Sequence, residues 1–173
     1  TQLIPGEHIF AYLNDLYIVC SKGRAAEAFK AVVGSVHAMA GVQSHLGKLR
    51  AWCSGGGEAP ADLAALGPHV WTASLPPAQN GLMVLGSPIG RPEYIQACGD
   101  ERLGEERKLL DVLPDLPDTQ CAWVVLALCC VPRANHLLRT VPPSLVEHYA
   151  SAHDYALWQG TNNLLGTETE AAA

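Results

Sequence analysis

One carboxylate, Asp15, has an unusual setting. It follows Asn14, and this polar pair separates two short apolar runs, residues 9–13 and 16–20, that are rich in aromatic and β-branched side chains. Two such runs joined by a two-residue loop predict a β-hairpin, and Asn tolerates the positive φ that tight hairpin turns require. The pattern therefore predicts two buried strands that present a single carboxylate at the tip of a hairpin.

Other residues that often carry chemistry lack the necessary spacing. His148 and His153 are five residues apart and lack the frame of a zinc-protease helix, and Ser87 does not lie in a G-x-S-x-G elbow. The 6 cysteines form no C-x-x-C pair and no zinc-site spacing, so we interpret them as reduced core or near-core thiols. The three glycines at residues 55–57 lack a phosphate-binding frame and indicate a surface loop.

Several residues in the second half are interpreted as structural. The charged stretch 100–108 is typical of a solvated helix face. Trp123 and Trp158 fall at helical core spacing, and Cys129 and Cys130 lie in an apolar run that favours packing roles.

Composition limits the class of protein. The chain has 173 residues, of which 49% are hydrophobic and 16% charged, so a packed core is expected and global disorder is not. The formal net charge of −6 argues against a basic nucleic-acid surface over the whole chain, although it leaves room for a local basic groove.

The sequence also bears on location. No secretory signal is visible, and the longest apolar run, residues 121–131, is shorter than the roughly 18 residues that cross a bilayer. We therefore expect an intracellular protein, nuclear or cytoplasmic, that does not bind membranes. The chain begins at Thr1 and not at Met, and it enters a strand almost at once, which favours a piece of something longer.

Periodicity predicts an α/β first half. After the hairpin, an apolar stripe over residues 24–40 indicates a helix that ends at Gly41. Residues 49–53 are expected to return as a strand, residues 61–66 to form a short helix, and residues 81–86 to form a short buried strand.

The second half is predicted to be entirely helical. The expected helices cover residues 91–113, 119–131, 134–139 and 144–165. Asp118 is the expected N-cap of the second of these helices, and Ser144 with Glu147 suggests a capping box for the last. The fold class is therefore α+β, with a boundary near Gly90 and a disordered tail over residues 167–173.

Three segments in this order resemble one known family. Residues 10–15 (FAYLND) resemble the Tyr-x-Asp-Asp hairpin of reverse transcriptases, most closely those of non-long-terminal-repeat (LINE-type) retrotransposons. Residues 46–48 with Trp52 resemble the lysine-bearing segment after the palm helix, and residues 84–90 resemble the hairpin that ends the palm and grips the primer. The resemblance implies a partial palm over residues 1–90 and a thumb-like helical region over residues 91–166.

The resemblance implies two-metal catalysis with a damaged metal site. Two Mg²⁺ ions about 3.5–4 Å apart would bridge the attacking oxygen and the triphosphate, and converging carboxylates would hold them. Family members supply two aspartates from the hairpin and one from an earlier strand. Asp15 matches the second hairpin aspartate and is the implied metal ligand, Asn14 replaces the first, and the third would lie upstream of Thr1.

The resemblance also implies further site residues. Lys48 would act as a general acid toward pyrophosphate, the alternative being a solvated lysine beside Arg50. Tyr12 would line the site of the nucleotide or primer end, or else be a core aromatic. Leu85 and Gly86 would contact the substrate.

Two functions are consistent with these observations. The first is a fragment of an RNA-directed DNA polymerase that acts on an RNA/DNA primer–template, belongs with the upstream palm and fingers of a longer polyprotein, and is inactive by itself. The second is a non-catalytic α/β-helical module that binds a partner protein or a nucleic-acid backbone.

Overall fold

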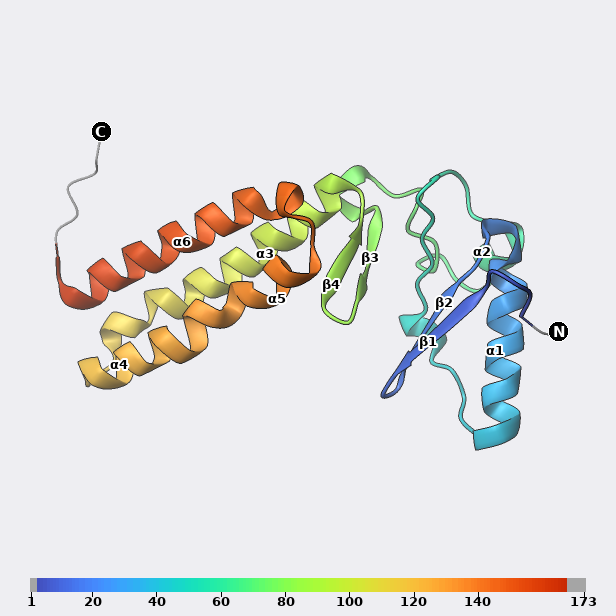
Figure 1. Ribbon diagram of the computed structural model, residues 1–173, viewed down its shortest axis with the longest axis horizontal. Helices are drawn as coiled ribbons and strands as arrows, with labels where there is room; N and C mark the ends of the chain where they lie inside the picture. The colour runs from blue at the N-terminus through green and yellow to red at the C-terminus, as the bar shows by residue number, and fades with distance from the viewer. Residues whose placement is uncertain (1–2, 168–173) are drawn as a thin grey trace. The chain divides into compact units, whose positions relative to one another are not determined.

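The computed structural model describes residues 3–167. The fold is mixed α+β, with helices and two separate antiparallel hairpins, which confirms the predicted fold class (Figure 1). The chain divides into two compact units at Leu75–Pro76. Each unit has its own buried core, and they are described separately.

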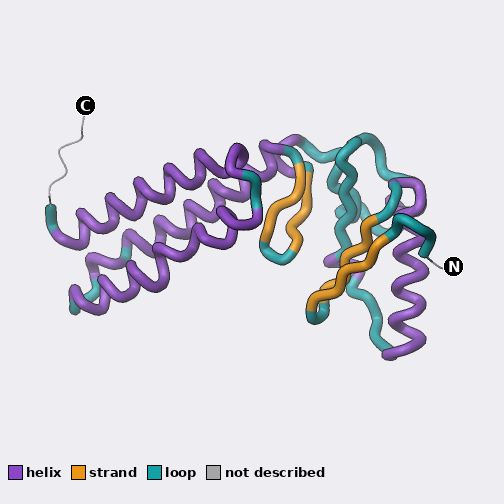
Figure 2. The backbone as a smooth tube through the Cα atoms, in the orientation of Figure 1, coloured by secondary structure: helices purple, strands orange, loops and turns teal. Residues whose placement is uncertain are grey.

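The first unit contains one hairpin, one long helix and much irregular chain (Figure 2). Strands β1 (His8–Tyr12) and β2 (Asp15–Val19) pair antiparallel and lead into helix α1 (Ala25–Ala40). Helix α1 ends at Gly41, whose φ of 67° is the left-handed C-cap conformation that favours glycine. The predicted helix and its stop are therefore confirmed.

The core of this unit is small. Its buried members are Ala26, Leu63, Trp71 and Ala73. The short helix α2 (Ala61–Ala64) supplies Leu63 and confirms the expected helix there. The glycines at residues 55–57 lie in a loop, as predicted, and the carbonyl of Gly57 accepts a hydrogen bond of 2.9 Å from the Trp71 indole.

The predicted return strand over residues 49–53 is wrong. Ala51 forms only an isolated parallel bridge with Trp71, and its carbonyl accepts a hydrogen bond of 3.0 Å from the Thr72 amide. The chain turns at residues 68–69 and again at 73–74, on both sides of Trp71. Because a ladder needs several aligned residues on each strand, these turns limit the pairing to one bridge.

The second unit places a small hairpin at one end of a helical bundle (Figure 1). The hairpin consists of β3 (Gly81–Val84) and β4 (Ser87–Gly90). The helices are α3 (Pro92–Asp111), α4 (Thr119–Val125), α5 (Asn135–Thr140) and α6 (Pro143–Leu165). The predicted strand 81–86 is therefore shorter than expected, and residues 87–90 return as its partner.

The chain between α4 and α5 stays helical but changes its winding. A π-helical turn, Leu126–Cys130, is followed by a 3₁₀ turn, Val131–Ala134. Pro132 lies at the start of this 3₁₀ turn. Because proline lacks the N–H that an α-helix needs and its ring crowds the preceding turn, the irregular winding accommodates it.

Helices α3 and α6 run parallel and pack closely along their length. Small residues allow this approach: a Cβ on Gly99 would lie 3.3 Å from the Tyr149 Cβ, and a Cβ on Gly160 would lie 3.0 Å from Leu110. Leu113 and Leu137 are fully buried members of the same core. The helical run through α4 and α5 returns the chain between them, which is why α3 and α6 share a direction.

The two predicted caps have different outcomes. Asp118 caps α4 as expected, because its side chain accepts hydrogen bonds from the amides of Gln120 (2.7 Å) and Cys121 (3.4 Å). The predicted Ser144 cap is wrong, because α6 begins one residue earlier at Pro143. Proline suits the first helical position, where its missing N–H is not needed, so Ser144 falls inside the helix.

Several residues expected in the core are exposed. Trp123 and Trp158 are each 48% exposed, and Trp158 stacks on Tyr155 with ring centroids 5.8 Å apart. All 6 cysteines are free thiols, and of the adjacent pair Cys130 is buried whereas Cys129 is exposed. The bundle consists of α3, α6 and the helical run through α4 and α5, and each of these keeps one face exposed to solvent. Apolar periodicity therefore overestimates how many apolar residues are buried.

The units divide earlier than the boundary expected near Gly90. The ring of Tyr94 in α3 lies against Gly81 and Gly90, where a Cβ on Gly90 would be 2.9 Å from Tyr94. This contact joins the hairpin to the helices. The expected disordered tail lies outside the described residues except for Thr167, whose hydroxyl donates a hydrogen bond of 2.9 Å to the Asn162 side chain.

The helical run Thr119–Thr140 is long and apolar enough to cross a membrane by length and composition. It joins the predicted helices 119–131 and 134–139, which explains why it exceeds the apolar run read from the sequence. The core helix of a soluble protein satisfies the same criterion, so this is weak evidence for a membrane.

Candidate functional site

The first candidate site is the tip of the β1–β2 hairpin, whose turn begins one residue earlier than predicted, so that each cross-strand pairing shifts by two residues. Tyr12 pairs with Asp15, so the two-residue loop is Leu13–Asn14 and Asp15 is the first residue of β2. Leu13, and not Asn14, has a positive φ of 53°. Sequence alternation could not separate the two registers, because both place the same side chains on each face of the hairpin.

The strands that carry this tip are exposed, although they were predicted to be buried. Phe10 is 58% exposed, Tyr12 57% and Leu13 90%. Helix α1 covers part of β2, where Tyr17 and Ile18 are half-buried. A two-stranded hairpin has two faces to bury, and this unit supplies too few elements to cover both. Tyr12 is therefore a surface aromatic beside Asp15.

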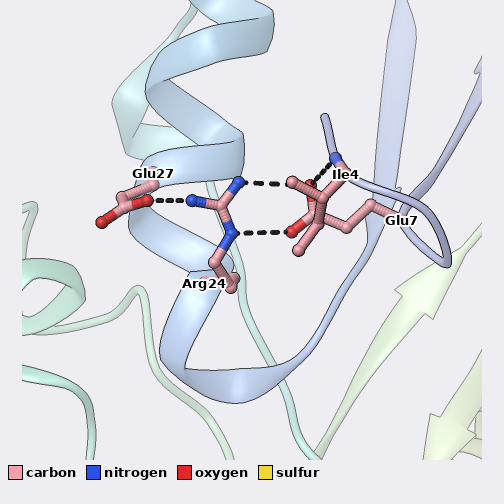
Figure 3. Close-up of polar contacts among 4 residues, drawn as sticks. All are labelled: Ile4, Glu7, Arg24 and Glu27. Atoms are coloured by element: carbon pink, nitrogen blue, oxygen red, sulfur yellow. Dashed lines mark hydrogen bonds and ion pairs between the residues drawn. The ribbon is translucent and has the colours of Figure 1, made fainter. Parts of the chain in front are cut away.

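The base of the hairpin is fixed to α1 by an ion-pair cluster. The Arg24 guanidinium donates to the Glu7 carboxylate over 3.0 Å and also bonds Glu27, so it lies between two carboxylates (Figure 3). The amide of Ile4 donates to the same Glu7 carboxylate over 3.0 Å. The hydrogen bond from Arg24 lowers the pKa of Glu7 below its usual value.

The residues around Asp15 do not fit a two-metal site. Within the described part of the chain, no three His, Cys, Asp or Glu side chains converge as metal ligands. Asp15 is the one carboxylate of the hairpin, and its Oδ2 lies 3.5 Å from the Tyr17 hydroxyl, which can donate to it. Two Mg²⁺ ions require several converging carboxylates, so Asp15 as the metal ligand stays a prediction.

Lys48 lies after α1 in a 3₁₀ turn, Leu46–Lys48, and is exposed. Among residues 3–167 its ammonium group forms no hydrogen bond or ion pair, and so none with Asp15. The neighbouring Arg50 donates to the carbonyls of Gly47 and Leu49 and closes this turn. The general-acid role of Lys48 stays a prediction.

The second candidate site is the tip of the β3–β4 hairpin. Val84 pairs with Ser87, so Leu85 and Gly86 form a two-residue loop with φ values of 49° and 79°. Positive φ at both positions is the signature of a type I′ turn. The hairpin expected from residues 84–90 is therefore present, and its tip residues are the two that the resemblance implied. Their contact with a substrate stays a prediction.

Two side chains from the bundle anchor this tip, and sequence analysis identified neither. The Arg102 guanidinium donates to the Gly86 carbonyl, and His136 Nε2 lies 3.1 Å from the Ser87 hydroxyl. Arg102 belongs to the charged stretch that was interpreted as solvated. The two contacts join residues that are 16 and 49 positions apart, and no local pattern predicts contacts at such separations.

A buried polar cluster joins α3 to α6. The Glu106 side chain accepts a hydrogen bond of 2.5 Å from the Tyr149 hydroxyl, and its other oxygen lies 2.7 Å from His153 Nδ1. Glu106 is only 4% exposed, so the prediction of a solvated face is wrong at this position. The position carried a signal, because Glu106 falls on the stripe of the buried Leu103 and Leu110.

The groups around this cluster do not form a catalytic arrangement. Burial and the hydrogen bond to Glu106 raise the pKa of Tyr149 well above its usual value, so its hydroxyl stays protonated as a donor. A pocket that includes Glu106 is lined by two arginines and three glutamates, Glu101, Arg102, Glu105, Glu106 and Arg133. Its charges nearly balance, and no nucleophile lines it.

No family model, curated protein or solved structure matches this chain. The geometry itself therefore defines the class: a mixed α+β protein of two units, each of which carries one hairpin with a two-residue tip.

Proposed function

We propose that this chain is part of an RNA-directed DNA polymerase of the LINE-type retrotransposon class, and that these 173 residues do not catalyse by themselves. The observation that carries the proposal is the β1–β2 tip, where Tyr12 lies opposite Asp15 and Asn14 occupies the turn. Helix α1, the Lys48 turn and a second two-residue hairpin follow in the order that the family resemblance implies.

The proposed inactivity follows from the small negative charge of the β1–β2 tip. Nucleotidyl transfer by two Mg²⁺ ions depends on anionic oxygen ligands, because Mg²⁺ is a hard cation that dehydrates reluctantly. The Asn14 amide oxygen brings no charge, and Asp15 is the one carboxylate of the tip. A single exposed carboxylate does not hold two divalent ions close together.

A primer-extension assay with Mg²⁺ or Mn²⁺ tests the activity. We expect no template-dependent synthesis by the 173 residues, and none after Asn14→Asp, because one further carboxylate does not complete the site. Asp15→Asn is the matched control for a contaminating polymerase. Robust synthesis by the unchanged chain that disappears in Asp15→Asn contradicts the proposed inactivity.

The second candidate is a non-catalytic module, and the exposure of the β1–β2 hairpin favours it. All five residues of β1 are exposed, and among residues 3–167 this strand pairs only with β2, so it offers both an apolar surface and a second backbone edge. Such edges pair readily with a strand of a partner protein.

Binding to a primer–template duplex at two salt concentrations separates a nucleic-acid ligand, which the polymerase fragment and a module for nucleic-acid backbone share, from a protein partner. A polymerase fragment contacts phosphates, so its affinity falls steeply as salt rises. An absence of binding at low salt favours a protein partner. Binding with little salt dependence contradicts contacts to the phosphate backbone.

A further inference from the structure

The β3–β4 tip holds an exposed leucine in an unfavourable backbone conformation. Leu85 has a φ of 49° and its side chain is 46% exposed. Type I′ turns favour Asn or Gly at this position, and bulky residues rarely adopt positive φ. Burial does not explain the choice of leucine here. Residues held in such conformations cluster at ligand-binding elements, so the tip is a candidate contact surface.

Two helices fix the conformation of this tip. Arg102 of α3 donates to the Gly86 carbonyl, and His136 of α5 lies 3.1 Å from the hydroxyl of Ser87, the first residue after the turn. The fit is close, because a Cβ on Gly86 would lie 3.3 Å from His136 Nε2. The turn is therefore held from two separate elements of the bundle.

The base of the hairpin is also fixed. The Tyr94 ring occupies the space beside Gly81 and Gly90, so any larger residue at either position would collide with it. Burial raises the pKa of Tyr94 to about 12, so the ring carries no charge at neutral pH. Because both ends are anchored, the tip is presented as part of the rigid helical unit.

We propose that Arg102 and His136 are positioning residues, which hold the Leu85–Gly86 tip in the conformation that contacts a nucleic-acid duplex. The functional part of this inference rests on the proposed function. Leu85 supplies an apolar contact at the tip, and the two bundle side chains keep its left-handed conformation populated in the free protein. Neither residue touches the duplex in this role.

The test combines amide hydrogen exchange at residues 84–87 with duplex binding measured by fluorescence anisotropy on the full chain. We expect Arg102→Ala and His136→Ala each to accelerate exchange at the tip by roughly 3- to 10-fold, the effect of one lost hydrogen bond, and to weaken duplex binding to a similar degree. His136→Gln and Arg102→Lys keep a hydrogen-bonding group at each position and should leave both measurements close to those of the unchanged chain. Arg107→Ala and His148→Ala are matched controls on exposed helix faces.

The variant Leu85→Asn distinguishes the conformation of the turn from the apolar contact that the leucine side chain makes. Asn-Gly is a favoured type I′ pair, so this variant should keep the tip protected from exchange while it weakens duplex binding. Unchanged tip exchange in both alanine variants overturns the inference, as do variants that loosen the tip and still bind duplex as the unchanged chain does. If the unchanged chain does not bind duplex, the proposed function fails, and the exchange data still decide whether Arg102 and His136 hold the tip.

Discussion

Glu106 illustrates what a single residue contributes to this fold. It lies in a run of charged residues, yet its carboxylate is buried between Tyr149 and His153 of the neighbouring helix. A buried carboxylate is tolerated only when it is hydrogen-bonded, and both partners come from α6. These bonds favour one register of α3 against α6, because a shift by one turn would remove at least one of the two partners of Glu106.

Tyr149→Phe tests this cluster. The change removes one hydrogen bond to a buried carboxylate, so we expect the free energy of unfolding to fall by about 1–3 kcal/mol. Urea denaturation measures it. Tyr155→Phe is the matched control, since Tyr155 is exposed and its hydroxyl accepts a hydrogen bond from the exposed Gln159. Equal stability of the two variants contradicts the structural role of Glu106.

Glu7 gives a pH dependence with a defined sign. The hydrogen bond from Arg24 lowers the pKa of Glu7 in the folded chain, so this carboxylate contributes stability above the ordinary glutamate pKa of about 4.3. That contribution disappears as the pH falls through the lowered folded pKa. We expect Glu7→Gln to make the unfolding free energy less dependent on pH between about 5 and 2.

The measurement is denaturant unfolding at several pH values in that range, on the unchanged chain and the variant. Glu58→Gln, in the exposed glycine-rich loop, is the control for loss of one carboxylate. A pH profile of Glu7→Gln that coincides with that of the unchanged chain contradicts the ion pair.

At the scale of elements, the two hairpins have the same loop length and differ in the contacts that hold them in place. Each has a two-residue loop with a leucine at positive φ in its first position, Leu13 and Leu85. The β1–β2 hairpin is attached at its base by Glu7 and Arg24; α1 covers part of β2, and β1 is exposed along its length. The β3–β4 hairpin is held at its base by Tyr94 and at its tip by the bundle.

Gly81→Ala tests the attachment of the second hairpin. A Cβ at this position would collide with the Tyr94 ring and lie 2.7 Å from the Ile89 carbonyl oxygen, a backbone atom that cannot move aside cheaply. We expect a loss of about 1–3 kcal/mol in unfolding free energy, as for an overpacked site. Gly104→Ala is the matched control, because it lies inside α3 with open space around it and should stabilise by about 0.5–1 kcal/mol. A neutral Gly81→Ala contradicts the close packing.

At the scale of the whole molecule, the two units differ in their capacity to fold. Seven hydrophobic residues are buried in the described part of the first unit, and three of them are alanines: Ala26, Ala28, Val32, Leu63, Val70, Trp71 and Ala73. The second unit buries a continuous cluster that extends from Ile95 to Ala156. The hydrophobic contribution scales with buried apolar area, so the second unit is the more stable of the two.

Residues 76–173 are therefore expected to fold without the first unit. We predict a helical circular dichroism spectrum and a cooperative thermal transition for this piece, and no cooperative transition for residues 1–75. Loss of cooperative unfolding in the isolated second unit contradicts its independence.

Local sequence determined the elements of this protein. Apolar periodicity with Gly41 as a stop specified α1, and Asp118 specified the start of α4. These features depend on neighbouring residues alone, so a local pattern is sufficient to find them.

Only the tertiary structure decided which of these surfaces are covered and which residues meet. The hydrogen bonds of Glu106, Arg102 and His136 join positions far apart in the chain. The exposure of Phe10 likewise depends on which distant elements pack nearby. Local alternation indicates that a side has apolar residues, but it does not say whether another element packs on it. The Asp15 hairpin and its Asn14 were predicted from local pattern, whereas the exposure of the hairpin and the absence of converging carboxylates among the described residues depend on what the rest of the fold supplies.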